Sequence, residues 1–213
     1  MNVGQWVVIG ISIFIGAWYL TGFYYNRRQG ERTLTWLRTS LEPWGKISSV
    51  RLLGSFSSGA QLEINRANAP FQSLEVTFVL ESRENLPLWL FNRLQGRRDE
   101  IFFKANLRSI PEQEIVVGRE TDPKVTQLID PGERRPFELV RGPGGFMYAW
   151  RGRQDGGRKE SLANFLEHYG EAVQRLVFQR DRPNLALRAW LAPLRNREAG
   201  EFFEAIGDLA GES

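Results

Sequence analysis

Cysteine is absent from this chain of 213 residues, and only one histidine is present. The missing thiols exclude disulfides, thiolate metal sites and cysteine nucleophiles, and they agree with a domain in a reducing compartment. A single histidine gives no cluster with metal-ligand spacing and no serine–histidine–aspartate arrangement. We therefore expect no metal, no cofactor and no catalytic residue, and we predict that the chain is not an enzyme.

A large excess of one charge is missing as well. The 28 lysines and arginines stand against 25 aspartates and glutamates, for a net charge of +3. This balance argues against a protein that coats nucleic acid, so DNA is not an expected partner.

Charged side chains are entirely missing from residues 6–25, WVVIGISIFIGAWYLTGFYY. Twenty residues of α-helix rise about 30 Å, which matches the hydrocarbon core of a bilayer. Trp6 lies at one end of the stretch, and Tyr24 and Tyr25 lie at the other, where interfacial aromatic side chains are usual. The stretch predicts a single transmembrane helix.

A cleaved signal peptide is the rival interpretation of residues 6–25. Such a peptide has a basic start, a shorter apolar core and a cleavage site between small residues. Residues 1–5 carry no basic side chain, and bulky aromatic residues precede Arg27. The helix is therefore predicted to remain as an anchor.

The flanks of the anchor predict its orientation. Arg27, Arg28 and Arg32 follow the apolar stretch, whereas residues 1–5 are uncharged. The positive-inside tendency then places residues 1–5 outside and everything after the anchor in the cytoplasm. The predicted organisation is a short extracytoplasmic N-terminus (1–5), a transmembrane helix (6–25), a basic connection (26–30) and a cytoplasmic domain (31–213).

The domain sequence mixes strand and helix patterns. Leu34, Leu37 and Leu41 predict a short amphipathic helix that Pro43 and Gly45 end, either a juxtamembrane strut or the first helix of the domain. Hairpin signals between strands favour an α+β fold with one mixed, largely antiparallel sheet. Strands are predicted at 47–53, 61–64, 73–80, 99–107, 113–117, 137–141, 146–151, 173–178 and 185–191, and further helices at 86–94, 123–129, from 161, and at 196–209.

Four segments after the anchor carry a family resemblance: TWLRTSLEPWG, LEVTFVLESRENLPLWLFNRL, DEIFFKANL and SLANFLEHYGEAVQRLVF. Together they resemble the cytosolic domain of the calumin family, the coiled-coil-containing subunit of the PAT complex in the endoplasmic reticulum, in a short prokaryotic-type form. The most specific piece is Phe165-Leu166-x-His168-Tyr169. The resemblance implies a non-enzymatic adaptor that assists insertion or folding of multi-spanning membrane proteins, with translocon or insertase as partner.

Two features of that family have no counterpart here. Its acidic lumenal region, linked to calcium binding, is replaced by residues 1–5, and its long basic C-terminal helix by the acidic segment 202–213. Calcium binding is therefore unsupported by the sequence, and ribosome contact stays open without support. Two other function classes stay open: an accessory structural subunit of a bioenergetic or transport complex, and a membrane-tethered enzyme, which the missing catalytic constellation disfavours.

Two groups of residues are candidate partner-binding sites. Ser12 and Gly16, four residues apart, are typical of a small-xxx-small face on which transmembrane helices pack. A basic cluster around a glycine-rich turn predicts contact with anionic lipid or RNA, against the alternative of an ordinary charged loop tip. Its members are Arg151, Arg153, Arg158 and Lys159.

Three further features have ordinary structural explanations. His168, beside Tyr169 on an apolar stripe, is predicted to be a packed, hydrogen-bonded side chain. The GPGG segment at 142–145 lacks the lysine of a phosphate loop and predicts a hairpin turn. Glu198, Glu201 and Glu204 are predicted to form the solvated face of the last helix.

Overall fold

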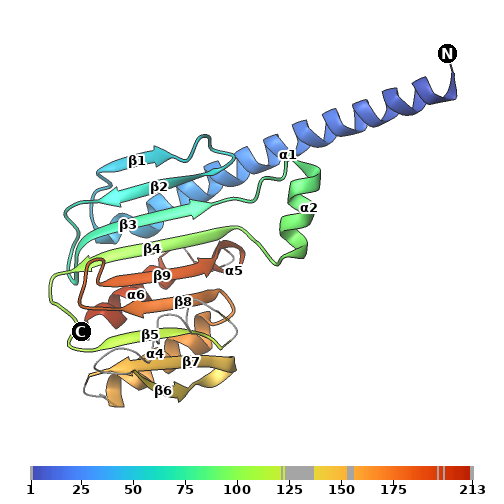
Figure 1. The fold of residues 1–213 in the computed structure, drawn as a ribbon. Helices are drawn as coiled ribbons and strands as arrows, with labels where there is room; N and C mark the ends of the chain where they lie inside the picture. Colours follow the sequence, from blue (N-terminus) through green and yellow to red (C-terminus); the bar gives the residue numbers. More distant parts are fainter. Residues whose placement is uncertain are drawn as a thin grey trace.

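The longest element of the protein is one continuous helix at its N-terminus. The structure is a computed structural model that describes residues 2–120, 122, 137–152, 156–195, 197–198 and 200–211. Helix α1 (Val3–Leu41) has 39 residues and runs without a break through residues 26–30, which were predicted as a connection. Figure 1 shows its N-terminal half projecting from the domain, while its C-terminal half lies behind the first strands of the sheet.

The two halves of α1 have different surroundings. The helix is long and apolar enough to cross a membrane, and only 6% of its most apolar 18-residue window is buried. In its second half, by contrast, Leu34, Leu37 and Leu41 are buried in the core of the domain. The exposure of the first half separates it from the core helix of a soluble protein, which buries its apolar side chains.

The end of α1 lies where the sequence predicts it. Pro43 follows in the short 3-10 helix η1 (Glu42–Trp44), and its missing N–H prevents continuation of the α-helix. Gly45 then adopts a φ of 130°, which disfavours residues with a side chain. The predicted amphipathic helix is therefore the second half of α1, and both open interpretations of it, strut and first domain helix, describe the same element.

The domain is built on a nine-stranded sheet with the order β1-β2-β3-β4-β9-β8-β5-β7-β6. Every ladder between described strands is antiparallel, which confirms the predicted α+β class with a largely antiparallel sheet. The strands are β1 (Ser49–Leu52), β2 (Gly59–Ile64), β3 (Phe71–Val79), β4 (Glu100–Leu107), β5 (Glu114–Arg119), β6 (Glu138–Arg141), β7 (Phe146–Arg151), β8 (Val173–Phe178) and β9 (Leu185–Trp190).

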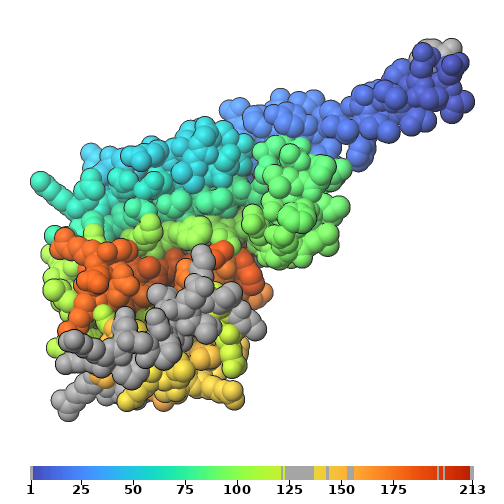
Figure 2. All heavy atoms as spheres, in the orientation of Figure 1, coloured from blue at the N-terminus to red at the C-terminus, as the bar shows by residue number. Residues whose placement is uncertain are grey.

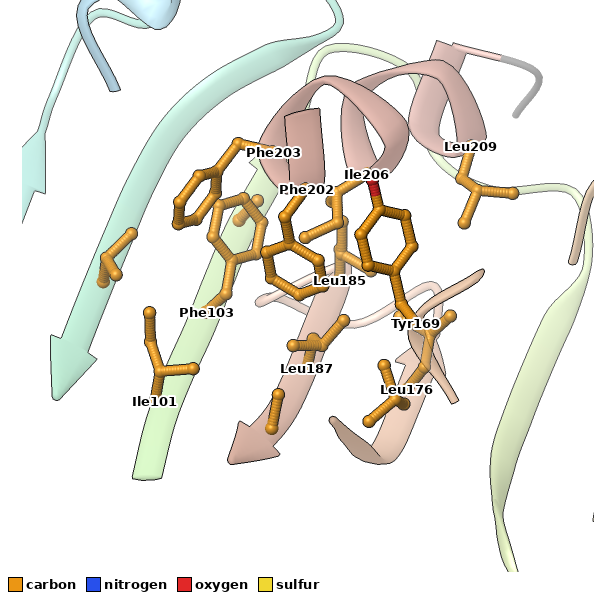
Figure 3. Packing of buried hydrophobic residues seen from close by; sticks show 14 of the residues in the cluster. Ile101, Phe103, Tyr169, Leu176, Leu185, Leu187, Phe202, Phe203, Ile206 and Leu209 are labelled. Carbon is orange, nitrogen blue, oxygen red and sulfur yellow. The ribbon is translucent and has the colours of Figure 1, made fainter. Parts of the chain in front are cut away.

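Among the described residues, the core lies between the sheet and the helices that cover one of its faces. Alternate side chains of β3, including Leu74, Val76 and Phe78, point into this core, as their period of two predicts. In Figure 3, Phe202 and Phe203 of α6 (Glu201–Gly211) lie over Phe103 of β4, with ring centroids of Phe203 and Phe103 5.8 Å apart. Helix α4 (Gly156–Tyr169) covers the neighbouring strands.

Local sequence signals predict the bounds of one of the remaining helices correctly and those of two others only in part. Helix α2 (Leu86–Leu94) has the predicted bounds, because Pro87 lies in its first turn and Asn85 caps it by accepting from the Leu88 N–H. Helix α4 begins at Gly156 rather than near 161. The predicted helix 196–209 is corrected to α6, which starts after Gly200 with its φ of 111°, and α5 (Leu191–Arg195) is a short helix that the sequence analysis did not predict. The predicted helix 123–129 lies outside the described residues.

The opposite face of the sheet carries polar cross-strand pairs. Lys104 and Glu75 lie directly opposite each other on β4 and β3 and form an ion pair of 3.2 Å. Arg188 of β9 donates to the Glu100 carboxylate of β4 through its Nε, at 3.1 Å, and its Nη2, at 2.6 Å. Such pairs stabilise strand pairing on a half-solvated face.

Candidate functional site

The junction between α1 and the domain is the best-defined polar site among the described residues. It begins at Trp18, which is still within the apolar stretch of α1. The indole N–H of Trp18 donates to the carbonyl oxygen of Arg83, at 2.9 Å, and the Trp18 ring packs on Trp89 of α2 with centroids 5.7 Å apart. The domain therefore contacts the predicted span before that span ends.

Small residues at a spacing of four bring α1 close to the domain. A Cβ added at Gly22 would lie 2.6 Å from the carbonyl oxygen of Arg83, and one added at Gly30 would overlap the carbonyl oxygen of Phe56. Between them, Asn26 is fully buried. Residues four apart share a helix face, so Gly22, Asn26 and Gly30 form the surface on which the domain is seated.

Asn26 is held by hydrogen bonds that use both ends of its amide. Its Nδ2 donates to the carbonyl oxygen of Glu81 at 2.6 Å and to the Glu84 carboxylate at 3.2 Å. Its Oδ1 accepts from Arg83 Nη1 at 2.9 Å. A buried amide satisfied in this way fixes the rotation of α1 against the segment that follows β3.

Arg83 links this amide to two carboxylates. Its Nη2 lies 2.8 Å from Asp99 Oδ2 and 3.4 Å from Glu81 Oε2. Arg93 of α2 also approaches Glu81, at 3.7 Å. The network joins α1, the segment after β3, α2 and the start of β4, so its opposite charges compensate one another where these four parts meet.

Further along α1, Gln29 accepts a hydrogen bond from Arg195, which ends α5. Gln29 is buried, as is Thr33 on the following turn. The polar contacts between α1 and the domain thus extend from Trp18 to Gln29. Beyond Gln29, the helix contacts the domain mainly through apolar side chains of the core. We call the set Trp18, Gly22, Asn26, Gly30 and Arg83 the junction.

The sequence-predicted packing pair lies on the free half of α1. Ser12 donates to the carbonyl oxygen of Val8, at 2.9 Å, and is exposed. No atom lies within 4 Å of a Cβ added at Gly16. Both positions are therefore accessible to another helix, and their role in packing stays a prediction.

The predicted basic cluster does not form a single exposed patch. Arg151 pairs with Glu114 on the neighbouring strand at 3.0 Å, and its guanidinium lies 4.1 Å from the centroid of the Phe137 ring. Arg158 is buried, 4.5 Å from the centroid of Phe178. Lys159 is exposed, and Arg153 lies outside the described residues. The expected exposure is corrected for Arg151 and Arg158, because cross-strand pairing and packing on an aromatic ring use their charges inside the domain.

The structure also shows the surroundings of the 142–145 turn and of the glutamates near the C-terminus. The 142–145 segment is a hairpin turn between β6 and β7, as predicted, and contains the 3-10 helix η2 (Pro143–Gly145). Glu201 and Glu204 form an exposed face of α6 beside the buried Phe202 and Phe203, as predicted, whereas Glu198 is exposed but lies before the helix begins.

His168 is exposed, which corrects the prediction that it is packed. Its Nδ1 lies 2.8 Å from the carbonyl oxygen of Asn164, one helical turn earlier. A carbonyl only accepts, so Nδ1 carries the donated proton. The apolar stripe of α4 consists of Leu162, Phe165, Leu166 and Tyr169. A helix that packs on a core needs apolar side chains at about three of every seven positions, and His168 lies just outside these positions.

Replacing His168 with alanine is expected to change the free energy of unfolding by no more than about 0.5 kcal/mol, since an exposed side chain with one local bond contributes little. Urea unfolding of the full chain in mild detergent, followed by tryptophan fluorescence, measures this. A loss of more than about 1 kcal/mol would contradict the exposed placement and restore the value expected for a buried hydrogen-bonding group.

Two tyrosines in the domain have raised pKa values. Burial raises the pKa of Tyr148 above its ordinary value. Burial also raises the pKa of Tyr169, with a further rise from Glu201 and an opposing effect of Arg197. Both phenols are thus neutral at physiological pH and act as packed aromatic side chains. In the part of the chain that the structure describes, no three histidine, aspartate or glutamate side chains are grouped to hold a metal ion.

No protein-family model matches this chain, and no curated protein matches it. The site is thus known from its geometry alone. Sequence reasoning selected Ser12 and Gly16 but missed the junction, although Gly22, Asn26 and Gly30 show the same four-residue spacing beginning six residues after Gly16. The asparagine between the two glycines was the available signal, because a polar residue directly after an apolar span needs hydrogen-bond partners.

Proposed function

We propose that this chain is a non-enzymatic, single-pass membrane-anchored adaptor, similar in role to calumin, that assists insertion or folding of multi-spanning membrane proteins at the translocon. Residues 1–5 lie outside, and the domain lies in the cytoplasm. The observation that carries the proposal is the continuity of α1, whose first half is exposed and apolar and whose second half is part of the core.

The junction gives this continuity a mechanical consequence. A domain joined to its anchor by a flexible linker samples many orientations, whereas the buried Asn26 and the close contacts of Gly22 and Gly30 hold this domain in one. Tethering near a membrane raises the effective concentration of a docking face toward other membrane-bound surfaces. An adaptor gains from both effects, whereas an enzyme acting on soluble metabolites gains little.

The same contacts support retention of the anchor. Cleavage after residue 25 would remove Trp18 and Gly22 and with them the hydrogen bond to Arg83. It would also make the buried Asn26 the new N-terminal residue, with a charged amino group inside the junction. A segment that forms part of the domain's own packing is a poor candidate for removal.

Site-specific photo-cross-linking in native membranes tests the proposal. A photoreactive residue at Ser12 reports partners of the anchor, one at Lys159 reports partners of the domain, and one at Ile110, an exposed apolar residue outside both candidate sites, serves as the control. Mass spectrometry of the products from Ser12 and Lys159 should identify translocon, insertase or nascent multi-spanning chains. Recovery of only a respiratory, photosynthetic or transport assembly would instead make this chain an accessory structural subunit.

A further inference from the structure

Helix α2 leaves a whole apolar face uncovered at the corner of the domain from which α1 emerges. None of its residues is buried, and the exposed fractions are 44% for Leu88, 50% for Leu90, 57% for Phe91 and 80% for Leu94. Figure 2 shows α2, in green, protruding beside the point where α1 leaves the domain. An exposed cluster of this kind marks an interaction surface.

We propose that α2 is a second membrane contact, an amphipathic helix that lies in the headgroup region of the bilayer beside the anchor. The inference rests on the proposed membrane anchoring of α1. It commits to lipid as the occupant of the apolar face, rather than to a protein partner or a second copy of the chain.

The first argument is depth. Trp89 of α2 packs on Trp18, which lies seven residues before the end of the apolar stretch at Tyr25. Seven residues correspond to about 10 Å of helix, so α2 lies level with the last two turns of the apolar stretch, where Tyr19, Tyr24 and Tyr25 are typical of the boundary between hydrocarbon and headgroups. The interfacial zone on each side of a bilayer is about 5–8 Å thick. A bilayer that surrounds the span therefore reaches α2.

The second argument is orientation. In Figure 1, α2 runs across the direction of α1 rather than along it, as a helix in the membrane plane must do. Leu86, Trp89 and Asn92 are partly covered by the protein, and the turns between them direct Leu90, Phe91 and Leu94 away from it. The alternation follows the helical period, so one face binds the domain and the other is free.

The third argument is the chemistry around α2. Tyr19, Tyr24 and Tyr25 are exposed on α1 at the same level, where the hydroxyl and ring of tyrosine favour a membrane interface. Arg97 and Arg98 follow α2 directly, and Arg27 and Arg28 are exposed two turns beyond Trp18. Apolar side chains at the same depth as aromatic residues, with arginines beside them, are typical of a helix that contacts a bilayer with anionic headgroups.

Depth-dependent quenching tests this contact, and the absence of native cysteine makes it direct. Three single-cysteine variants of the full chain, L94C, I13C and I110C, are labelled with an environment-sensitive fluorophore. They are then reconstituted in vesicles of phosphatidylcholine and phosphatidylglycerol. Ile13 reports the anchor, and Ile110, 68% exposed, is the control for an exposed apolar residue elsewhere.

A spin-labelled lipid with its nitroxide near the headgroups should quench the label at Leu94, and iodide in the water should not. The label at Ile110 should behave in the opposite way. The anchor is read with a second lipid, whose nitroxide lies deep in the acyl chain, because Ile13 is near the middle of residues 6–25. If that lipid quenches Ile13 but Leu94 is open to iodide, or is protected from all quenchers by protein, the inference about α2 fails while the anchor stands. If the deep nitroxide does not quench Ile13, the anchor proposal fails and the inference falls with it.

Discussion

Replacing Arg83 with methionine is expected to destabilise the domain by about 3 kcal/mol, at the lower end of the 3–5 kcal/mol typical of a broken buried ion pair. Methionine keeps most of the volume but leaves Asp99 and Glu81, whose side chains are 13% and 4% exposed, without their nearest cation. Asn26 also loses the donor to its Oδ1. The loss is at the lower end because Arg93 remains 3.7 Å from Glu81.

A matched control lies on α1, next to Asn26. Arg27 and Glu31 form an ion pair of 3.1 Å with side chains 56% and 52% exposed, so R27M should cost no more than about 0.5 kcal/mol. Urea unfolding of both full-length variants in the same mild detergent gives the comparison. Equal midpoints for R83M and R27M would show that the junction network contributes no more than a surface pair.

Replacing Gly30 with alanine is expected to loosen α1 from the domain, although alanine is the better helix former. The gain in helix propensity is about 1 kcal/mol. The new methyl group would overlap the carbonyl oxygen of Phe56, a backbone atom in the turn before β2 that has no rotamer with which to move away. Overpacking of this kind typically costs about 1–3 kcal/mol, so the net effect is destabilising.

The same substitution at Gly16 separates propensity from contact. No atom lies within 4 Å of a Cβ added there, so G16A should keep the propensity gain and leave the domain's unfolding midpoint unchanged. Limited proteolysis in detergent adds a second measurement, since a loosened α1 exposes the backbone between residues 26 and 41. Identical midpoints and cleavage patterns for G30A and G16A would contradict a close seat at Gly30.

The sequence predicts those parts of the fold that depend on neighbours along the chain. The period of two in β3 places Leu74, Val76 and Phe78 in the core because successive strand residues point to opposite faces. Asn85 and Pro87 define the start of α2 through local hydrogen bonding and a fixed φ. The apolar, uncharged residues 6–25 predict an element long enough to span a membrane.

The errors concern residues whose surroundings come from distant parts of the chain. From its neighbours along the chain, Gly30 was predicted to end a connection between the anchor and the domain. In the structure it lies within a continuous helix, where its missing side chain lets the Phe56 carbonyl oxygen approach. Arg151 and Arg158 belong to a basic cluster by sequence, yet one pairs with Glu114, 37 positions away, and the other covers Phe178. His168 falls outside the buried stripe because the phase of α4 is set by the strands beneath it.

What the sequence by itself determined is therefore the list of elements, the sheet class and an apolar helix fit for a membrane, since hydrophobic period, caps and length are local properties. Only the tertiary structure decided that anchor and domain share one helix, that Asn26 and Arg83 meet there, and that α2 lies beside Trp18 with its apolar face free. The physical reason is that a buried polar or close-packed contact is defined by both of its partners. Asn26 and Arg83 are 57 residues apart, and only the folded sheet brings them together.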